Sequence, residues 1–297
     1  MRETVIDKAS HSEVESYLMC PRRHYYSYVQ RIQPIRTTDP LARGNVGHEV
    51  LSCYYSMRKE GLSHDDAGMA AMDYLPVAAN QYDVYDPDKL WDELYWLLLN
   101  YFEKYRDDEF RVIETEILHE VNVTGDYIMP IKVDLVLEIP GKGIVVRDWK
   151  FTNDFYTVDK IDMSPQLPKY FAVLMELGIK ANVLEYDQLR YRNTKDNKAN
   201  PFERYMRTPV PVTADRVTRT MHEQFLVAKK VAGIHQLSIE EAESIAVRNT
   251  MACNLCPFKD ICDSDLNGGY DSPLITESFY EKRVRPSDTV PGNARSV

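Results

Sequence analysis

The pattern of hydrophobic and polar positions is clearest in the middle of the chain, where it predicts a hairpin of two strands. Residues 131–139 and 144–150 are rich in β-branched side chains and are bounded by turn-forming residues. Asp148 and Lys150 lie two positions apart, so both project from the same face of their strand. Further on, the serine and proline at 164–165 can begin a helix. The stretch therefore reads as a strand hairpin with charged side chains on one face, followed by a helix.

Helix and strand patterns continue on both sides of this hairpin. A helix is expected to begin near Leu41, residues 52–110 read as helices rich in Tyr and Leu, and strand character returns over residues 111–121. The helix after the hairpin is expected to end at Gly178, and residues 182–191 read as another strand. This mixture of strands and helices predicts an α/β fold, with residues 52–110 as a helical insertion packed on its core.

Composition narrows the class of protein. With 297 residues, 44% of them hydrophobic, the chain can form one large domain or two small ones. It has no run of about eighteen apolar residues and no apolar stretch at its start, so we expect no membrane span, no signal peptide and a cytoplasmic location. The net charge of −10 argues against a general nucleic-acid-binding surface. Basic clusters at 22–23 and 190–198 could follow a phosphate backbone or be ordinary solvated faces.

Carboxylates and a lysine on neighbouring strands suggest a metal site. Asp134 lies in the first strand of the hairpin, and Asp148 and Lys150 lie in the second. Hard oxygen ligands suit Mg²⁺ or Mn²⁺, and such an ion can activate water for phosphodiester hydrolysis. For any single aspartate, a solvated charge on the outer face is the better interpretation. The combination with Gln166 and Tyr170, spaced i,i+4 on the following helix, favours a site.

Two further elements can bring side chains to these acids. Gly44 and His48 lie one turn apart on the helix that begins near Leu41, so the missing side chain of Gly44 predicts a close approach to the sheet that carries His48 towards the acids. On the strand over residues 111–121, Glu114 and Glu116 share a face.

The cysteines give a second candidate site. Cys253, Cys256 and Cys262 form a C-x2-C-x5-C motif, and Cys20 supplies a fourth thiol near the start of the chain. In a reducing compartment such a set binds metal before it forms disulfides, and both iron–sulfur clusters and zinc accept four cysteines. Cys53 is left over and is expected to be a buried, small apolar residue.

Taken together, these motifs resemble those of the PD-(D/E)xK nucleases of the RecB and Cas-four type. The resemblance rests on Asp134, on Asp148-x-Lys150 and on Gln166-xxx-Tyr170, and it spans about residues 12–262. Asp148 stands where many members carry Glu, and an aspartate still coordinates a metal but reaches one methylene less far.

Two more motifs extend the resemblance. Gly44-xxx-His48 is similar to the N-terminal metal-ligand motif of the family. One cysteine near the start and three near the end are similar to the iron–sulfur staple of Cas-four and AddB-type nucleases, which implies a [4Fe–4S] cluster in preference to zinc. Its ligands would be Cys20, Cys253, Cys256 and Cys262.

The resemblance implies a restriction-endonuclease-like core, in which helices flank a mixed central sheet. It implies a single nuclease domain over residues 1–265, with the catalytic core at about 111–192, the helical insertion at about 52–110 and the cluster formed by residues 20 and 253–262. The remaining residues, 266–297, are expected to form a flexible tail.

The resemblance also assigns roles to single residues. The implied metal ligands are three side chains and one backbone carbonyl, those of His48, Asp134, Asp148 and Trp149. Lys150 would position or activate water, and Gln166 and Tyr170 would orient Lys150 or the substrate phosphate. Glu116 falls where the family often has an upstream acid, and Glu114, on the same strand face, is the alternative that the sequence leaves open.

The implied activity is that of a Mg²⁺- or Mn²⁺-dependent DNA exonuclease, acting at single-stranded ends in recombination, repair or phage DNA metabolism. Recombination, helicase or integrase proteins are candidate partners. One alternative is a CRISPR-associated nuclease that trims DNA before its integration. Another is a module that binds DNA without cutting it, which the intact Asp134, Asp148 and Lys150 argue against.

The hairpin makes a geometric prediction. A regular four-residue turn over residues 140–143 would place Asp134 and Asp148 on opposite faces, because a shift of one residue reverses every side chain. We therefore predict a loop of three or five residues, or a glycine bulge at Gly141 or Gly143, that brings the two carboxylates to one face.

Overall fold

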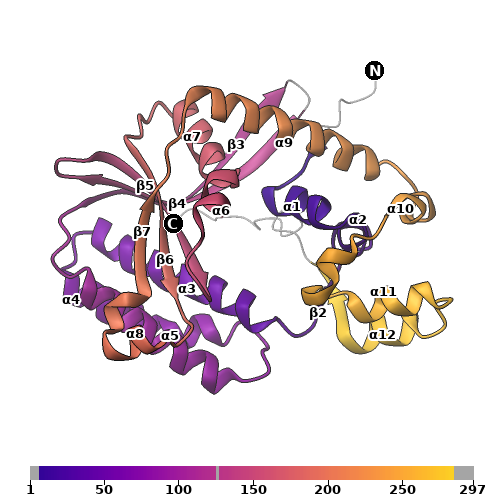
Figure 1. Cartoon of the computed structure of the whole chain (residues 1–297), viewed down its shortest axis with the longest axis horizontal. Helices are drawn as coiled ribbons and strands as arrows, with labels where there is room; N and C mark the ends of the chain where they lie inside the picture. Colours follow the sequence, from indigo (N-terminus) through magenta and orange to yellow (C-terminus); the bar gives the residue numbers. More distant parts are fainter. Residues whose placement is uncertain (1–6, 125–126, 284–297) are drawn as a thin grey trace, which may run out of the picture. The chain divides into compact units, whose positions relative to one another are not determined.

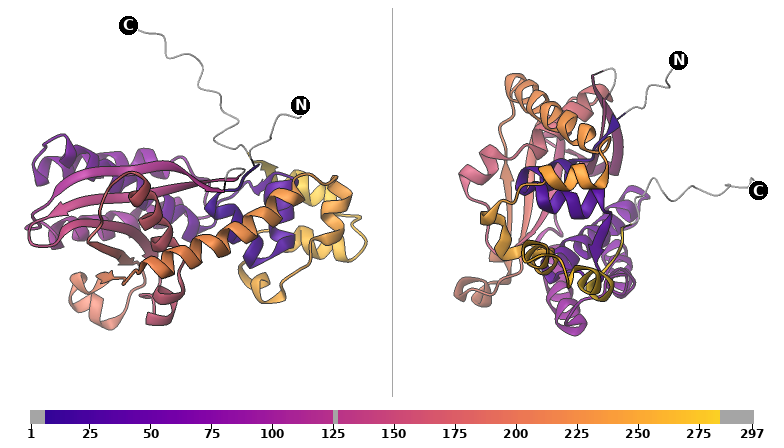
Figure 2. Two further views of the ribbon diagram at one scale, coloured as in Figure 1. Left: turned by 90° about the horizontal axis from the view of Figure 1, so that it is seen from above. Right: turned by 90° about the vertical axis from the view of Figure 1, so that its right-hand side faces the viewer.

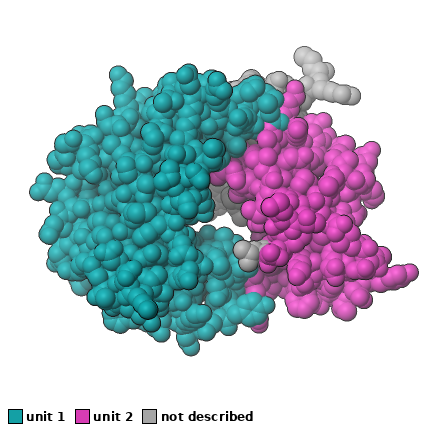
Figure 3. All heavy atoms as spheres, in the orientation of Figure 1, with its two compact units in different colours: residues 1–8, 37–226 teal, residues 9–36, 227–297 magenta. Residues whose placement is uncertain are grey.

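The protein is represented by a computed structural model that describes residues 7–124 and 127–283. The chain divides into two compact units, which Figure 3 shows in separate colours. Unit 1 comprises residues 1–8 and 37–226, and unit 2 comprises residues 9–36 and 227–297. The stretch that the sequence predicts to be one domain, residues 1–265, therefore contributes to both units.

Unit 1 is built on a mixed sheet, six-stranded in the part of the chain that the structure describes. Its strands run in the order β3-β4-β5-β6-β7, and the short β1 pairs in parallel with the start of β4. β5 and β6 are parallel, whereas the other neighbours along this order are antiparallel. The strands are β1 (Asp7–Lys8), β3 (Arg111–Thr124), β4 (Tyr127–Ile139), β5 (Gly143–Thr152), β6 (Val183–Arg190) and β7 (Tyr205–Pro209). The predicted α/β fold with a mixed central sheet is confirmed.

Helices cover both faces of this sheet (Figures 1 and 2). On one face α3 packs against β3 and β5 and also contacts α4 and α5, and on the other face α7 contacts β3, β4 and β6. The helices are α3 (Asp39–Lys59), α4 (His64–Ala79), α5 (Pro87–Lys104), α6 (Val158–Met163), α7 (Gln166–Glu176), α8 (Lys195–Ala199), η2 (Pro201–Arg204) and α9 (Ala214–Ile234), which continues into unit 2. Among the described residues, no helix combines the length and the apolar character that crossing a membrane requires.

Helix α5 shows how the sequence sets this packing. The side chain of Asp86 accepts a hydrogen bond from the backbone N–H of Lys89 and caps the first turn. Leu90, Leu94 and Leu97 follow at spacings of three or four residues and are all buried. Burial of each leucine contributes about 2 kcal/mol, so this stripe holds α5 against its neighbours more strongly than the cap does.

Unit 2 joins the two ends of the chain around a small aromatic core, which contains Tyr25, Tyr26, Phe258, Ile261 and Tyr280. Its elements are α1 (His11–Met19), α2 (Pro21–His24), η1 (Tyr25–Val29), β2 (Ile32–Pro34), α10 (Ile239–Ile245), η3 (Thr250–Leu255), α11 (Lys259–Leu266), α12 (Ser272–Phe279) and β8 (Tyr280–Lys282).

Part of the stretch that the sequence predicts to be a flexible tail is folded, and the prediction is wrong for that part. Residues 272–282 form α12 and β8, and β8 pairs antiparallel with β2. The ring of Tyr280 is buried and stacks on Phe258 at a centroid distance of 5.5 Å, so apolar contacts hold this segment in place. Residues 284–297 lie outside the described residues.

Candidate functional site

The loop between β4 and β5 determines which side chains share a face of the sheet. Ile139 pairs with Gly143, so the loop contains only three residues, 140–142. The same register, continued along the two strands, places Asp134 opposite Asp148. Directly opposed residues of an antiparallel pair project from one face. Of the predicted arrangements (a loop of three or five residues, or a glycine bulge), the three-residue loop is confirmed, and it places the two aspartates on the same side.

Glycine is required at the end of this loop. Gly143 has a φ of 75°, in the left-handed region that other residues avoid. A Cβ atom at this position would also lie 2.3 Å from Oδ1 of Asn182. That oxygen accepts a hydrogen bond of 2.8 Å from the backbone N–H of Ile144. Any side chain at residue 143 would therefore disturb the contact that fixes the start of β5.

The two aspartates converge on one phenol. The hydroxyl of Tyr170, on α7, lies 2.8 Å from Oδ1 of Asp148 and 3.5 Å from Oδ1 of Asp134. Gln166, one turn earlier on α7, donates from Nε2 to the same Asp148 oxygen at 2.6 Å. The backbone N–H of Trp149 donates to Oδ2 of Asp134 at 3.1 Å. Helix α7 thus presents the i,i+4 pair expected from the sequence directly to the acids.

Lys150 lies within this network. Its Nζ donates to Oε1 of Gln166 at 2.8 Å and forms an ion pair with the carboxylate of Asp148. Burial alone would lower the pKa of Lys150, but the charges of Asp148 and Asp134 raise it to about 12. The ammonium group is therefore fully protonated near neutral pH.

His48 reaches the acids from α3. Its Nε2 lies 2.9 Å from the carbonyl oxygen of Trp149, and its Nδ1 lies 3.3 Å from Oδ2 of Asp134. The close approach of α3 to the sheet occurs at Gly47, where a Cβ would lie 2.1 Å from the ring of Phe151. Placing that approach at Gly44 is wrong, because nothing lies within 4 Å of a Cβ built there.

The structure separates the two candidate upstream acids. Glu114 pairs with Lys59 at 2.6 Å on the surface of the protein. Glu116 instead lies opposite Asp134, since the residues on either side of it pair with those on either side of Asp134. One of its oxygens pairs with Lys132, and the other is buried without a hydrogen-bond partner among the described residues. Glu116 is thus the one that joins the cluster.

Glu116 also has an unusual backbone conformation. Its φ is 55°, which a residue with a side chain adopts at a cost of about 1–2 kcal/mol. Such strain persists where the surrounding structure imposes it, and it is common at functional sites.

The electrostatics of the site favour a bound cation. Burial, followed by the negative charge of Asp148, raises the pKa of Asp134 well above its usual value. Burial and the charges of Asp134 and Asp148 likewise raise the pKa of Tyr170 well above 10. Desolvation lowers the pKa of His48 to about 4, so its imidazole is neutral near pH 7 and able to coordinate a metal.

The donor set fits a divalent metal ion. One nitrogen of His48 and one carboxylate oxygen each of Glu116 and Asp134 lie within 4.8 Å of one another. These three residues line a cavity of about 610 Å³, which gives an ion and a substrate access to them. The buried oxygen of Glu116 that accepts no hydrogen bond within the described part of the chain is available as a further metal ligand. Two more oxygen ligands lie next to these three residues. Asp148 contacts the hydroxyl of Tyr170, and the carbonyl oxygen of Trp149 contacts His48.

Sequence reasoning missed two residues beside this cavity. Lys132 lies two positions before Asp134 on β4, and the period-2 rule that groups Asp148 with Lys150 would have found it. Glu49 follows His48, lines the cavity, and accepts hydrogen bonds from the hydroxyls of Tyr74 and Tyr82 at 3.2 and 2.9 Å. No sequence signal marks Glu49, because its partners come from the α4 region.

The four predicted cysteine ligands lie in unit 2. All of them line one cavity of about 140 Å³, together with Arg22, Arg23 and Tyr26. Cys20 is buried between α1 and α2, and the other three lie in or next to η3 and α11. Cys53, by contrast, lies on α3 in unit 1 and packs against its core.

Solved structures of other proteins are similar to this chain. A structure described as "Crystal structure of SSO0001" is similar to 87% of this chain and 86% of its own, at 14% identity and a TM-score of 0.39. A structure from Eubacterium rectale, called "Putative exonuclease", is similar over 90% of this chain and 95% of its own, at 12% identity and a TM-score of 0.50. At 12% identity, the likeness to the second structure concerns the fold alone. No curated protein sequence matches the chain.

A comparison with protein families identifies the family of this chain. The PD-(D/E)XK nuclease superfamily matches residues 8–263, most of the chain and all the residues of the site. Its match agrees with a mixed sheet that carries Asp134, Asp148 and Lys150 on one face beside His48. The chain belongs to the PD-(D/E)XK nuclease superfamily.

Proposed function

We propose that this protein is a metal-dependent DNA exonuclease of the RecB and Cas-four type, which hydrolyses phosphodiester bonds at single-stranded ends. The observation that carries the proposal is the row of acids on three neighbouring strands, with Glu116 on β3, Asp134 on β4 and Asp148 on β5. Lys150 on β5 pairs with Asp148, and His48 on α3 lies beside Asp134. Carboxylates, an imidazole and a lysine gathered around one site suit phosphodiester hydrolysis better than any other chemistry that the chain offers.

The residues of this row have separate roles in the proposal. The ligands of the ion would be His48, Glu116, Asp134, Asp148 and the carbonyl of Trp149. A Mg²⁺ or Mn²⁺ ion bound there supplies an activated water and neutralises charge on the phosphate. The ammonium group of Lys150 would donate hydrogen bonds to that water or to a phosphate oxygen. Gln166 and Tyr170 would hold Asp148 and Lys150 in place, as their present hydrogen bonds do.

Two glutamates on β3 give a matched test of this assignment. Glu116→Gln removes a proposed ligand. Glu114→Gln changes a residue two positions earlier on the same strand, whose exposed side chain pairs with Lys59. With Mg²⁺ or Mn²⁺, we expect Glu116→Gln to slow the hydrolysis of linear single-stranded DNA by about 100-fold or more, and Glu114→Gln to leave the rate unchanged. Equal rates for the two variants would contradict the role of Glu116.

The shape of the substrate tests the exonuclease assignment separately. An enzyme that needs an end should degrade linear single-stranded DNA and leave a single-stranded circle of the same sequence intact. Cutting of the circle at a comparable rate would overturn the assignment as an exonuclease while leaving a nuclease in place.

We further propose that the cysteine-lined cavity holds a [4Fe–4S] cluster. The four thiols line this one cavity together, which supports a single group bound by all of them. The preference for a cluster over zinc rests on the resemblance to the iron–sulfur staple of Cas-four and AddB-type nucleases. Protein purified without oxygen should be brown and absorb broadly near about 400 nm. Stoichiometric zinc without iron would overturn this assignment.

A further inference from the structure

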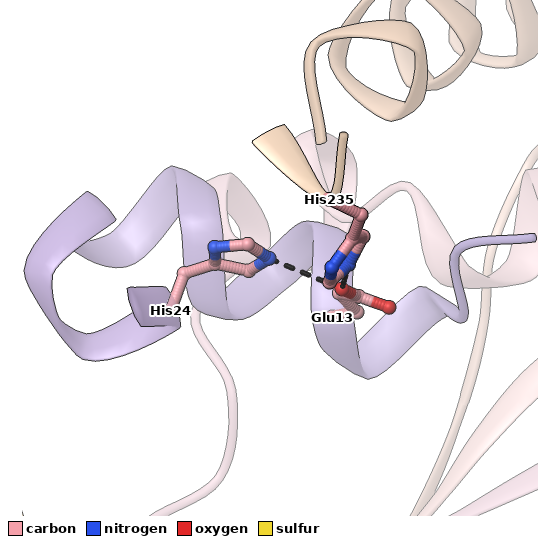
Figure 4. A group of neighbouring side chains, drawn as sticks. All are labelled: Glu13, His24 and His235. Atoms are coloured by element: carbon pink, nitrogen blue, oxygen red, sulfur yellow. Dashed lines mark hydrogen bonds and ion pairs between the residues drawn. The ribbon is translucent and has the colours of Figure 1, made fainter. Parts of the chain in front are cut away.

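We propose that unit 2 contains a second metal site, in which Glu13, His24 and His235 bind a divalent transition-metal ion such as Zn²⁺. The site is separate from the row of acids in unit 1 and from the cysteine cavity, and it does not depend on the nuclease activity. Figure 4 shows the two imidazole rings directed at the carboxylate of Glu13.

The geometry of the three side chains carries this inference. Nε2 of His24 lies 3.1 Å and Nε2 of His235 lies 2.5 Å from the same oxygen of Glu13, and all three ligand atoms lie within 4.8 Å of one another. Ligands held at about 2.1 Å from one ion are roughly 3.0–3.4 Å apart in octahedral or tetrahedral geometry. The His24 pair already has that spacing, and the His235 pair would need to open by about 0.5 Å.

Two of the three ligands, Glu13 and His24, are enclosed by the surrounding protein. The His24 ring stacks on Tyr28 at a centroid distance of 5.4 Å and meets the edge of Tyr17 at 5.6 Å, so its orientation is fixed. Glu13 and His24 are buried, whereas 27% of the His235 side chain is exposed. Water could therefore complete the coordination from the side of His235, and an ion could enter there.

The charge of the site suits a cation. The carboxylate of Glu13 is the acidic member of the set, and both imidazole rings face the same oxygen of it. Two imidazole nitrogens and one carboxylate are a donor set for zinc and related transition metals, whereas Mg²⁺ prefers oxygen alone. The ion proposed here thus differs in class from the one proposed for the acids of unit 1.

A bound ion would cross-link distant parts of the chain. Glu13 lies on α1, His24 ends α2, and His235 follows α9, so one ion would join segments 222 residues apart in the sequence. A link that closes so long a loop restricts the unfolded chain strongly and stabilises the folded one. Binding of the ion should therefore raise the unfolding temperature of unit 2.

The test uses the full chain with Zn²⁺ and, as a spectroscopic probe, Co²⁺. His235→Gln removes the most exposed ligand, and His119→Gln is the matched control, because His119 forms an exposed pair with Glu176 at 3.2 Å without a second imidazole. We expect wild type and His119→Gln to bind one more equivalent of Zn²⁺ than His235→Gln, whose affinity at this site should fall by more than about 100-fold. Co²⁺ at the site should lack the intense near-ultraviolet absorption of a thiolate–cobalt bond, which separates it from the cysteines.

A second variant keeps the test decisive if His235→Gln does not fold. His235→Asp places a carboxylate beside Glu13, so it should be less stable than wild type without metal and should recover its unfolding temperature on addition of Zn²⁺. If Glu13 and the histidines form only ion pairs, Zn²⁺ should rescue nothing. An equal zinc content in His235→Gln and wild type, or no rescue of His235→Asp, would overturn the proposal.

Discussion

The close packing of α3 on β5 at Gly47 makes a sharp prediction about the position of His48. Gly47→Ala would place a methyl group 2.1 Å from Cζ of Phe151 and 2.4 Å from both Cε atoms of its ring. No real contact is that short, so either the ring or the helix must move. Because His48 is the next residue on α3, a displaced helix stretches its 2.9 Å contact with the carbonyl of Trp149.

The size of the effect follows from two opposing terms. Replacing glycine by alanine inside a helix stabilises it by about 1 kcal/mol. Forcing a methyl group into a filled space costs about 1–3 kcal/mol. We therefore expect Gly47→Ala to destabilise the fold by about 1 kcal/mol in net terms. A shift of His48 by about 1 Å should slow hydrolysis by about 100-fold.

Gly44 provides the matched control on the same helix. Nothing lies within 4 Å of a Cβ at this position, so Gly44→Ala should stabilise the protein by up to about 1 kcal/mol. Urea-induced unfolding of the two variants measures both effects, and Phe151→Leu in the Gly47→Ala background should restore stability. If Gly47→Ala proves as stable as Gly44→Ala, the packing described for α3 is incorrect.

Three further predictions concern single side chains. Glu116→Gly should be more stable than Glu116→Ala by about 1–2 kcal/mol in denaturant unfolding, because only glycine adopts a φ of 55° without strain, and equal stabilities would argue against that conformation. Tyr170→Phe removes the hydroxyl between Asp134 and Asp148 and should lower stability in chelator by about 1–3 kcal/mol, whereas an unchanged melting temperature would show that the hydroxyl is dispensable. Burial and a nearby arginine lower the pKa of His64 in the folded state, so its contribution to stability is present above pH 6.5 and is lost as the pH falls through the pKa of the folded state. His64→Gln should therefore weaken the dependence of stability on pH, and a pH profile identical to that of wild type would contradict this prediction.

The sequence predicts best those features that depend on local pattern. The period-2 strands of the hairpin and the i,i+4 pair Gln166 and Tyr170 lie where the pattern places them. The parity argument for Asp134 and Asp148 also succeeds, because sharing a face constrains the length of a short loop. In each case the residues that determine the outcome lie close together along the chain.

Features that depend on distant contacts could not be predicted in this way. The choice of Glu116 over Glu114 depends on which partner each finds on another element, and the approach at Gly47 depends on a ring of β5. The pairing of β8 with β2 joins the two ends of the chain, which no local pattern signals.

Some basic residues have structural roles that the sequence left open. Arg22, in one of the predicted basic clusters, pairs with Glu243 at 3.3 Å and lies over the rings of Tyr25 and Tyr26. Arg192, in the other, pairs with Asp154 at 3.0 Å on the surface. The first contact favours a role in packing, and the second is typical of a solvated face.

The central claim is tested most directly by the release of nucleotides from end-labelled single-stranded DNA, measured for wild type, Asp148→Asn and Asp154→Asn. Asp154 is an exposed acid six residues further along the chain and serves as the control. The account predicts that wild type and Asp154→Asn hydrolyse the DNA with Mg²⁺ or Mn²⁺, that a chelator stops them, and that added metal restores them. Asp148→Asn should be slower by about 1000-fold or more, which corresponds to about 4 kcal/mol of transition-state stabilisation. Hydrolysis by folded Asp148→Asn at the wild-type rate would contradict the account.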